Sequence, residues 1–278
     1  LDFDGSLTKQ KSLLAKHNPE IINLRDFSSS ARLWMSRKIA TSVKERVKNT
    51  SGRYINLIGS GDFHHLSSVI LDDFKEPVSL IVFDFHPDWD ILPPFIGCGS
   101  WVTRALRNPF ILKTVLLGPS SADLSFPLIQ TANFNSLRGN RVEIYPYALK
   151  DSRVFLRQVP LNRSIRTERT LLMTKIFWKN IQGLNLKDFL SGIIEKLPTK
   201  NVYVSVDKDC LKNEYALTNW EEGLFSLDEL LMMLSLIRDK LNLIGADITG
   251  EYSACPQGSF LKSWASRLDH PKIVKARN

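Results

Sequence analysis

The sequence lacks the features that mark secreted, membrane-spanning and cysteine-stabilised proteins. Its three cysteines are too few and too scattered for a disulfide framework or a cysteine-based zinc site. No apolar run approaches the roughly 20 residues needed to cross a bilayer, and no signal-peptide pattern opens the chain. The chain starts at Leu1 rather than Met, as a truncated or processed N-terminus would. These absences predict a cytoplasmic protein without a membrane partner.

Positive charge exceeds negative charge, but no nucleic-acid recognition module accompanies it. The chain has 37 Lys and Arg against 29 Asp and Glu, a formal net charge of +8. The basic residues are dispersed, and no stretch interleaves them with aromatic residues as such a module would. Net charge by itself affects the solubility of a protein and its weak, non-specific attraction to oppositely charged molecules. We therefore expect a solvated basic surface and no nucleic-acid partner.

Short apolar runs alternate with helical patterns along the chain. The apolar, β-branched runs predict strands at residues 54–58, 80–83, 111–117, 142–145, 171–177, 202–206 and 243–248. Helices are predicted at residues 29–47, 186–196 and 226–240, the last with Ser226 and Glu229 at the spacing of a capping box. This alternation predicts a single α/β domain over residues 1–278, with a doubly wound sheet. Residues 162–169 are expected to form an exposed loop or insertion.

Histidine is scarce, and three of the five histidines lie within 23 residues of one another. Residues 84–88 read Asp-Phe-His-Pro-Asp and follow an apolar run, so Asp84, His86 and Asp88 project from one face of a strand end. Residues 59–65 read Gly-Ser-Gly-Asp-Phe-His-His and follow the first predicted strand, where ligands bind in open parallel sheets. Taken alone, this glycine-rich stretch is more typical of a turn with a satisfied histidine.

A pair of aspartates follows the predicted strand at residues 202–206. Asp207 and Asp209 would repel each other on one strand face unless a cation compensates them, and Lys208 points to the opposite face. Six ligand-type groups thus sit at predicted strand ends: His64, Asp84, His86, Asp88, Asp207 and Asp209. They are too many for one tetrahedral zinc and suit two divalent ions that share carboxylates, with Mn²⁺ favoured. Such ions, about 3.5–4 Å apart, hold a hydroxide at neutral pH, which predicts hydrolysis.

The order of these motifs resembles the ureohydrolases, the family of arginase and agmatinase. That family carries Gly-Gly-x-His, Asp-x-His-x-Asp and Ser-x-Asp-x-Asp in this order, and the likeness organises residues 50 to 255. It implies an arginase-like three-layer α/β/α fold whose central, mostly parallel sheet has about eight strands. It also implies two Mn²⁺ ions and hydroxide attack on a cationic guanidino or amidine compound, or on an amide, and is compatible with a homo-oligomer.

The resemblance also implies a role for each ligand. His64 and Asp88 would bind one ion, and His86 and Asp209 the other. Asp84 and Asp207 would bridge the two ions. Asp88 would in addition hydrogen-bond the hydroxide. The neighbouring His65 leaves one ambiguity of register, and His64 is preferred because Leu66 and Ser67 then follow as in the family.

The chain departs from the family at three places. The family's proton-shuttle histidine, shortly after the second motif, is absent here, where residues 97–102 read Gly-Cys-Gly-Ser-Trp-Val. Ser100, Cys98 and His65 are candidates to replace it. The third motif continues into Cys210 rather than proline, and Glu251, the candidate contact to a guanidinium, comes one residue later than in the family.

Three other functions compete with this interpretation. A divergent protein that binds metal or a small ligand without turnover is compatible with the missing histidine. A zinc deacetylase is the second alternative, but its zinc site needs only one Asp-x-His and one later Asp, so Asp88 and Asp209 would have no role as ligands. Residues 2–8 (Asp-Phe-Asp-Gly-Ser-Leu-Thr) mimic the nucleophile loop of haloacid-dehalogenase-like phosphatases, but the strand that should precede the loop is almost absent.

Overall fold

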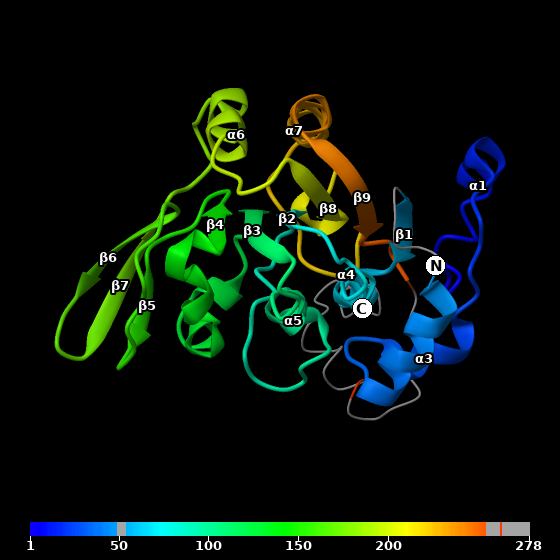
Figure 1. Ribbon diagram of the computed structural model, residues 1–278, viewed down its shortest axis with the longest axis horizontal. Helices are drawn as coiled ribbons and strands as arrows, with labels where there is room; N and C mark the ends of the chain where they lie inside the picture. The colour runs from blue at the N-terminus through cyan, green and yellow to red at the C-terminus, as the bar shows by residue number, and fades with distance from the viewer. Residues whose placement is uncertain (49–53, 254–261, 263–278) are drawn as a thin grey trace.

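The molecule is built around a six-stranded sheet with helices on both faces (Figure 1). The computed structural model describes residues 1–48, 54–253 and 262. The sheet has the strand order β1–β9–β8–β2–β3–β4, and every neighbouring pair is parallel. Its strands are β1 (Ile55–Gly59), β2 (Val78–Phe83), β3 (Ile111–Gly118), β4 (Val142–Pro146), β8 (Asn201–Asp207) and β9 (Asn242–Thr249).

Helices form the outer two layers. In Figure 1, α6 and α7 lie above the sheet, and α3, α4 and α5 lie below it. The α-helices are α1 (Lys11–His17), α2 (Ser28–Ala31), α3 (Arg37–Val47), α4 (Leu66–Leu71), α5 (Trp101–Ala105), α6 (Leu186–Ile194) and α7 (Leu227–Lys240). In α7 the predicted capping box is present. The Glu229 backbone N–H donates a hydrogen bond to the Ser226 hydroxyl, and the Ser226 backbone N–H donates one to the Glu229 carboxylate. None of the helices in the described ranges combines the length and apolar character of a membrane span.

Strand β2 is buried along its whole length because both of its faces are covered. Leu80 and Val82 pack into the hydrophobic cluster on one side of the sheet, and Ile81 and Phe83 into the cluster on the other side. Alternate residues of a strand point to opposite faces, so a strand covered on both sides must be apolar throughout. The predicted α/β fold with a central parallel sheet is confirmed, although the described part of the chain has six central strands where the family resemblance implies about eight.

Three further strands form a separate antiparallel sheet, in the order β5–β7–β6. They are β5 (Ser152–Phe155), β6 (Ile165–Arg169) and β7 (Met173–Trp178). The predicted strand at 171–177 therefore lies outside the parallel sheet, and the stretch expected to be a loop at 162–169 contains β6. Burial alternates along β5 and β7, which is the pattern of a sheet with one solvated face.

The helix predicted at residues 29–47 is broken in the structure. Arg32 through Ser36 separate α2 from α3, and Leu33 adopts a positive φ of 63°. The break carries the buried Arg32 guanidinium to the carboxylates of Asp4 and Asp62. An ion pair that must be satisfied in the interior thus overrides the local helical pattern.

Candidate metal centre

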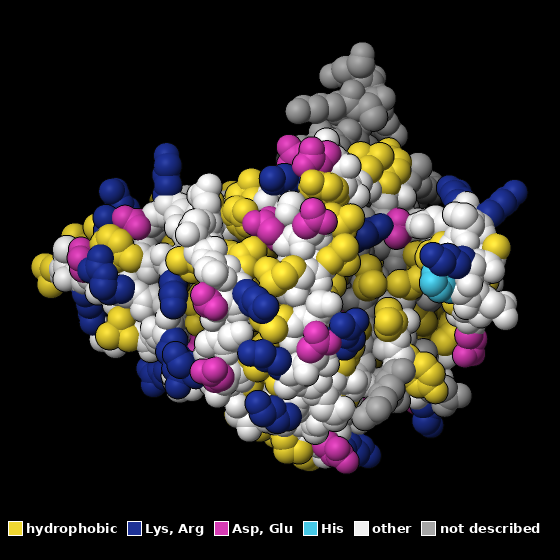
Figure 2. Space-filling view, turned by 90° about the horizontal axis from the view of Figure 1, so that it is seen from above, with side chains coloured by type: hydrophobic (Ala, Val, Ile, Leu, Met, Phe, Trp, Pro, Cys, Tyr) yellow, Lys and Arg dark blue, Asp and Glu magenta, His cyan; other side chains and the backbone are white. Residues whose placement is uncertain are grey.

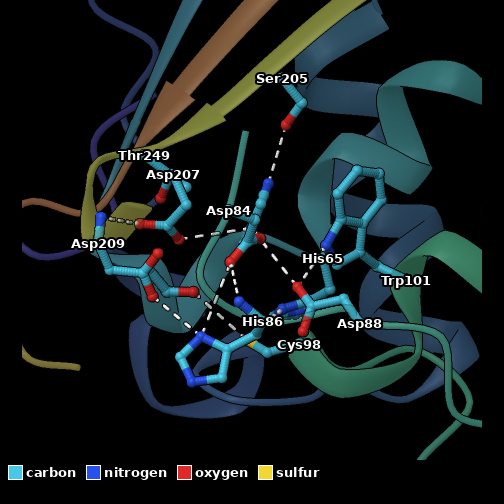
Figure 3. A network of polar contacts seen from close by, with 12 residues as sticks. His65, Asp84, His86, Asp88, Cys98, Trp101, Ser205, Asp207, Asp209 and Thr249 are labelled. Carbon is cyan, nitrogen blue, oxygen red and sulfur yellow. Dashed lines mark hydrogen bonds and ion pairs between the residues drawn. The ribbon is translucent and has the colours of Figure 1, made fainter. Parts of the chain in front are cut away.

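Six side chains from three strand ends meet around one cavity of about 370 Å³ (Figure 3). Parallel strands end at the same edge of a sheet, so residues that follow β1, β2 and β8 become neighbours. All six predicted ligands line this cavity: His64, Asp84, His86, Asp88, Asp207 and Asp209.

Asp84 lies at the centre of the group and faces both histidines. Its Oδ2 is 3.1 Å from His64 Nδ1, and its Oδ1 is 3.7 Å from His86 Nδ1. Ligand atoms of His64, Asp84 and Asp88 lie within 4.8 Å of one another. The same holds for Asp84, His86 and Asp209. Two potential ligand clusters therefore share one carboxylate.

Both imidazole rings are held at Nε2, and each turns Nδ1 toward the carboxylates. His64 Nε2 lies 2.8 Å from Ser205 Oγ, and that hydroxyl donates to Asp247 Oδ1 at 2.6 Å. His86 Nε2 lies 3.0 Å from Glu221 Oε2. Metal-binding histidines usually donate their second ring N–H to such a partner, which fixes the orientation of the ring.

The buried carboxylates of the cluster repel one another and would be stabilised by a nearby positive charge. Burial would lower the pKa of His64, but the carboxylates of Asp84, Asp207 and Asp88 raise it to about 10. Burial, together with the charge of Asp84, raises the pKa of Asp88 well above its usual range. Burial, together with the charge of Asp209, does the same for Asp207. A bound cation would stabilise the ionised carboxylates and take the place of the proton on His64.

Two buried atoms of the cluster lack a hydrogen-bond partner. They are His64 Nδ1 and Asp84 Oδ2, on residues that are each 1% exposed; the two atoms lie 3.1 Å apart but form no hydrogen bond with each other. Leaving a buried polar atom unpaired costs about 1–3 kcal/mol, so such atoms in a folded protein require an explanation. A divalent cation between them would satisfy both, and this mixture of carboxylate and imidazole donors suits Mn²⁺. The residues present thus fit a bound divalent metal ion.

Asp88 is fixed by its backbone and by Trp101. Its φ is +47°, a left-handed conformation that aspartate tolerates better than most residues. Trp101 Nε1 donates to Asp88 Oδ2 at 2.7 Å, and the indole ring packs 4.6 Å from the His64 ring. The buried tryptophan therefore orients one ligand and contacts another.

We expect Trp101→Phe to weaken metal binding without unfolding the protein. The phenyl ring keeps most of the packing but removes the N–H that holds Asp88, and losing such a partner costs about 10–100-fold in metal affinity. Titration against a fluorescent chelator measures the change. Trp178→Phe is the matched control, because Trp178 Nε1 donates to Ser152 Oγ in the antiparallel sheet. Equal affinity of the wild type and Trp101→Phe would contradict the orienting role.

A glycine lets the chain pass beside Asp207. Gly250 has a φ of +95°, and a Cβ there would lie 2.5 Å from Asp207 Oδ1. A side chain at this position would therefore displace the carboxylate. Gly250 therefore leaves room for the Asp207 carboxylate in the cluster.

Three of the candidate catalytic residues, Ser100, His65 and Glu251, lie outside the cavity lining. Ser100 donates to the Pro94 carbonyl at 2.6 Å. His65 is buried with Nδ1 3.4 Å from Cys98 Sγ, and burial and the charge of Lys262 lower its pKa to about 3. Glu251 forms an ion pair with Lys208, with Nζ and Oε1 2.6 Å apart. Cys98, the remaining shuttle candidate, lines the cavity.

Three acidic residues of the cavity wall were not singled out from the sequence as a site. Glu221 lies in the loop after Trp220, Asp90 lies in the loop that follows β2, and Asp123 lies in a short 3-10 helix, Ala122–Leu124, that follows β3. Asp90 accepts a hydrogen bond from Thr131, and burial, aided by the charge of Asp123, raises the pKa of Asp90 to about 6. Of the three, Asp90 has the nearest link to a motif, since it follows Asp88 by two residues.

The N-terminal motif forms a different structure. Asp2 Oδ2 accepts a hydrogen bond from Arg25 Nε at 2.8 Å, and Asp4 Oδ2 from Arg32 Nη2 at 3.1 Å. Neither aspartate lines the metal cavity. Both carboxylates are thus held in ion pairs, which does not favour the phosphatase alternative.

Comparison by sequence gives one distant relative. No protein-family model matches the chain. A protein of Thermotoga maritima described as uncharacterized is 26% identical over 251 residues, which make up 90% of this chain and 78% of that protein.

Comparison by structure finds solved structures described as an agmatinase and an amidino hydrolase. A hypothetical agmatinase from Burkholderia thailandensis superposes with a TM-score of 0.54 at 17% identity, over 95% of this chain and 76% of that one. Proclavaminate amidino hydrolase from Streptomyces clavuligerus superposes with a TM-score of 0.52 at 16% identity, over 83% of this chain. The match spans 66% of the hydrolase, slightly under two thirds of its length. This chain therefore has the α/β fold of the arginase and agmatinase enzymes, with distant structural similarity to them, and carries buried His and Asp clusters at its strand ends.

Proposed function

We propose that this chain is a hydrolase that uses two divalent metal ions, with manganese favoured, to cleave a C–N bond in a guanidino, amidine or amide small molecule. One observation carries the proposal: the two histidines point Nδ1 at opposite oxygens of Asp84, and a polar partner holds each ring at Nε2. That is the arrangement expected of a carboxylate that bridges two metal ions.

Each ion has its own set of donors in this proposal. His64, Asp84 and Asp88 hold one ion, and Asp84, His86 and Asp209 hold the other. Asp207 Oδ2, 3.4 Å from His64 Nδ1, is the second bridging group. Bound at this site, the ions would supply Lewis acidity and lower the pKa of water to near neutrality.

The charge of the cavity wall favours a cationic substrate. Beyond the ligands, the wall contains Asp90, Asp123 and Glu221, and among the described residues no Lys or Arg lines it. Two divalent ions roughly balance the four ligand aspartates, so the remaining carboxylates leave the cavity negative. A guanidinium or amidinium group would be attracted there and form charge-assisted hydrogen bonds.

Metal binding without turnover is the second candidate. It is favoured by the positions of Ser100 and His65, which lie outside the cavity lining, so that Cys98 is the one shuttle candidate of the three that lines the cavity. Fold likeness cannot separate the two functions, because one fold hosts active and inactive sites alike.

Metal analysis followed by a substrate screen tests both candidates. Protein loaded with Mn²⁺ and desalted should retain about two ions per chain. Guanidino, amidine and amide compounds should then be assayed for release of urea or ammonia. Two ions with turnover support the hydrolase, and two ions without turnover on any compound support the second candidate. One zinc ion, or no metal, would contradict both.

We expect Asp90→Asn and Asp123→Asn each to raise the KM for a cationic substrate while the metal content stays at two ions. Losing a hydrogen bond to a charged group costs about 1.5–3 kcal/mol, or roughly 10–100-fold in KM. Steady-state kinetics at constant ionic strength measure the effect. Asp239→Asn is the control, because Asp239 is exposed on α7 and pairs with Arg238. An unchanged KM in both variants would remove these residues from substrate recognition.

A further inference from the structure

The antiparallel sheet extends from the β4 edge of the molecule and carries most of its net charge (Figure 1). We call residues 150–179, which contain β5, β6 and β7, the arm. The arm has eight Lys and Arg residues against two Asp and Glu, a net charge of +6 out of the chain's +8. Although Lys and Arg occur throughout the sequence, the rest of the chain is therefore close to neutral. Figure 2 shows Lys and Arg gathered with hydrophobic side chains at this end of the molecule, on the left of the view.

The end of the arm exposes leucines where turns usually carry polar residues. Leu171 is 92% exposed, Leu156 80% and Leu172 60%. The Leu156 amide donates to the Leu172 carbonyl at 2.9 Å, so the two turns lie side by side. We call these three leucines, with Phe155 and the Phe126 ring that packs 5.0 Å from it, the apolar tip. Gly, Asn, Asp and Ser are the usual residues of such turns, whereas these leucines leave most of their apolar surface exposed.

Basic side chains flank the apolar tip on two strands. Arg153 on β5 and Arg169 on β6 are exposed, and neither has a carboxylate partner among the described residues. Arg166 packs its guanidinium 3.9 Å from the centre of the Phe177 ring on the outer face of the arm. The arm thus presents an apolar end with cationic sides.

We propose that the apolar tip inserts into the surface of a membrane rich in anionic phospholipids, with the flanking arginines at the lipid headgroups. Peripheral membrane binding commonly combines buried apolar side chains with basic residues that attract anionic lipids. This proposal departs from the sequence prediction of no membrane partner, because a surface contact of this kind needs no spanning segment.

Other partners fit the apolar tip less well. A nucleic acid would engage the arginines through phosphates and aromatic rings through stacking, which leaves the exposed leucines without a role. A second copy of the chain, docked arm to arm, would bring two groups of charge +6 together. Charge complementarity combined with exposed leucine therefore favours the anionic lipid surface.

Vesicle sedimentation tests the proposal with the full-length chain. The wild type should bind phosphatidylcholine vesicles that contain about 30% phosphatidylserine, should bind pure phosphatidylcholine far more weakly, and should lose affinity as salt is raised. Leu156→Ser with Leu171→Ser should weaken binding at least about tenfold. Arg153→Glu with Arg169→Glu should weaken it about 20-fold or more. Leu231→Ser and Arg238→Glu are the controls, since both positions are exposed on α7 and should leave binding unchanged.

Four outcomes would overturn the proposal. In the first, the wild type fails to bind anionic vesicles; in the second, it binds neutral vesicles equally well. In the third, the leucine variants bind as strongly as the wild type. In the fourth, the protein binds single-stranded RNA but not vesicles, and Arg153→Glu with Arg169→Glu abolishes the RNA binding. Light scattering after gel filtration adds a further check, because an oligomer that dissociates on Leu156→Ser and Leu171→Ser would make the tip an interface between copies. Thermal melting verifies that the variants remain folded, which is expected because the leucines are exposed.

Discussion

Asp84→Asn should remove both metal ions from the protein at once. Asp84 is the one residue common to the two ligand clusters of the described chain, and each of its oxygens faces a different histidine. Asparagine keeps the size of the side chain but offers a neutral carbonyl oxygen on one side only. Metal content measured after desalting should fall from about two ions to nearly none, and any hydrolytic rate should fall at least about a thousandfold, because several kcal/mol of transition-state stabilisation is lost.

Single-cluster variants make this prediction specific. Asp88 belongs to one cluster and Asp209 to the other. Asp88→Asn and Asp209→Asn should therefore each lower the affinity for one ion and leave the affinity for the other ion unchanged. Retention of one tightly bound ion in Asp84→Asn would mean that the two clusters do not share a bridge. Loss of both ions in all three variants would instead mean that the ions bind as a single cooperative unit.

Most of the candidate site could be predicted because its residues follow strand ends. His64, His86 and Asp207 come from different parts of the sequence, but each lies just after an apolar run that became a central strand. Parallel strands that pair in register bring their carboxyl ends together, so predicting the strands was enough to predict the meeting of the ligands. The structure also brings His64 rather than His65 to the carboxylates, as the sequence favours.

The supporting residues could not be predicted, because loops and packing place them. Glu221 reaches His86 from a loop after β8, and Trp101 reaches Asp88 from the start of α5. Neither shows a periodic pattern or a motif in the sequence, and both contacts depend on tertiary packing. The hydrogen bond from Ser205 to Asp247 likewise depends on the pairing of β8 with β9.

The errors in the fold have comparable causes. Residues 171–177 were assigned to the parallel sheet on hydrophobicity, yet Thr174 and Lys175 interrupt the apolar run, and the strand pairs antiparallel with β5 and β6. A short strand with one buried and one solvated face has a weak hydrophobic pattern in the sequence, because half of its side chains face solvent. In the helix predicted at 29–47, the buried pairing of Arg32 with Asp62 outweighs local propensity.

Protons and metal ions compete for the same atoms of the site. The pKa of His64 is raised to about 10 by its carboxylate neighbours, so the metal-free protein carries a proton on this ring at neutral pH. The stabilisation from that charged ring is complete below pH 6.5 and is lost as the pH rises through about 10. The raised pKa values of Asp88 and Asp207 act in the same direction, because stability from their protonated forms is lost as the pH rises. Asp84, whose pKa is lowered to about 2, loses its contribution only in strong acid.

Metal removal should therefore destabilise the protein more at pH 8.5 than at pH 6. Binding of Mn²⁺ must displace the His64 proton, so its affinity should rise about tenfold per pH unit for each proton released. At 100 times Kd, one site adds about 2.7 kcal/mol, or roughly 5–10 °C in Tm for a chain of this size. Thermal melts of chelator-treated protein with and without Mn²⁺ measure the difference, and calorimetry in buffers of different ionisation enthalpy counts the protons. Mg²⁺ in place of Mn²⁺ is the control for ionic strength and should give a smaller shift, since imidazole ligands disfavour it. A Tm gain that is the same at both pH values, with no proton released, would show that the ion binds somewhere other than His64.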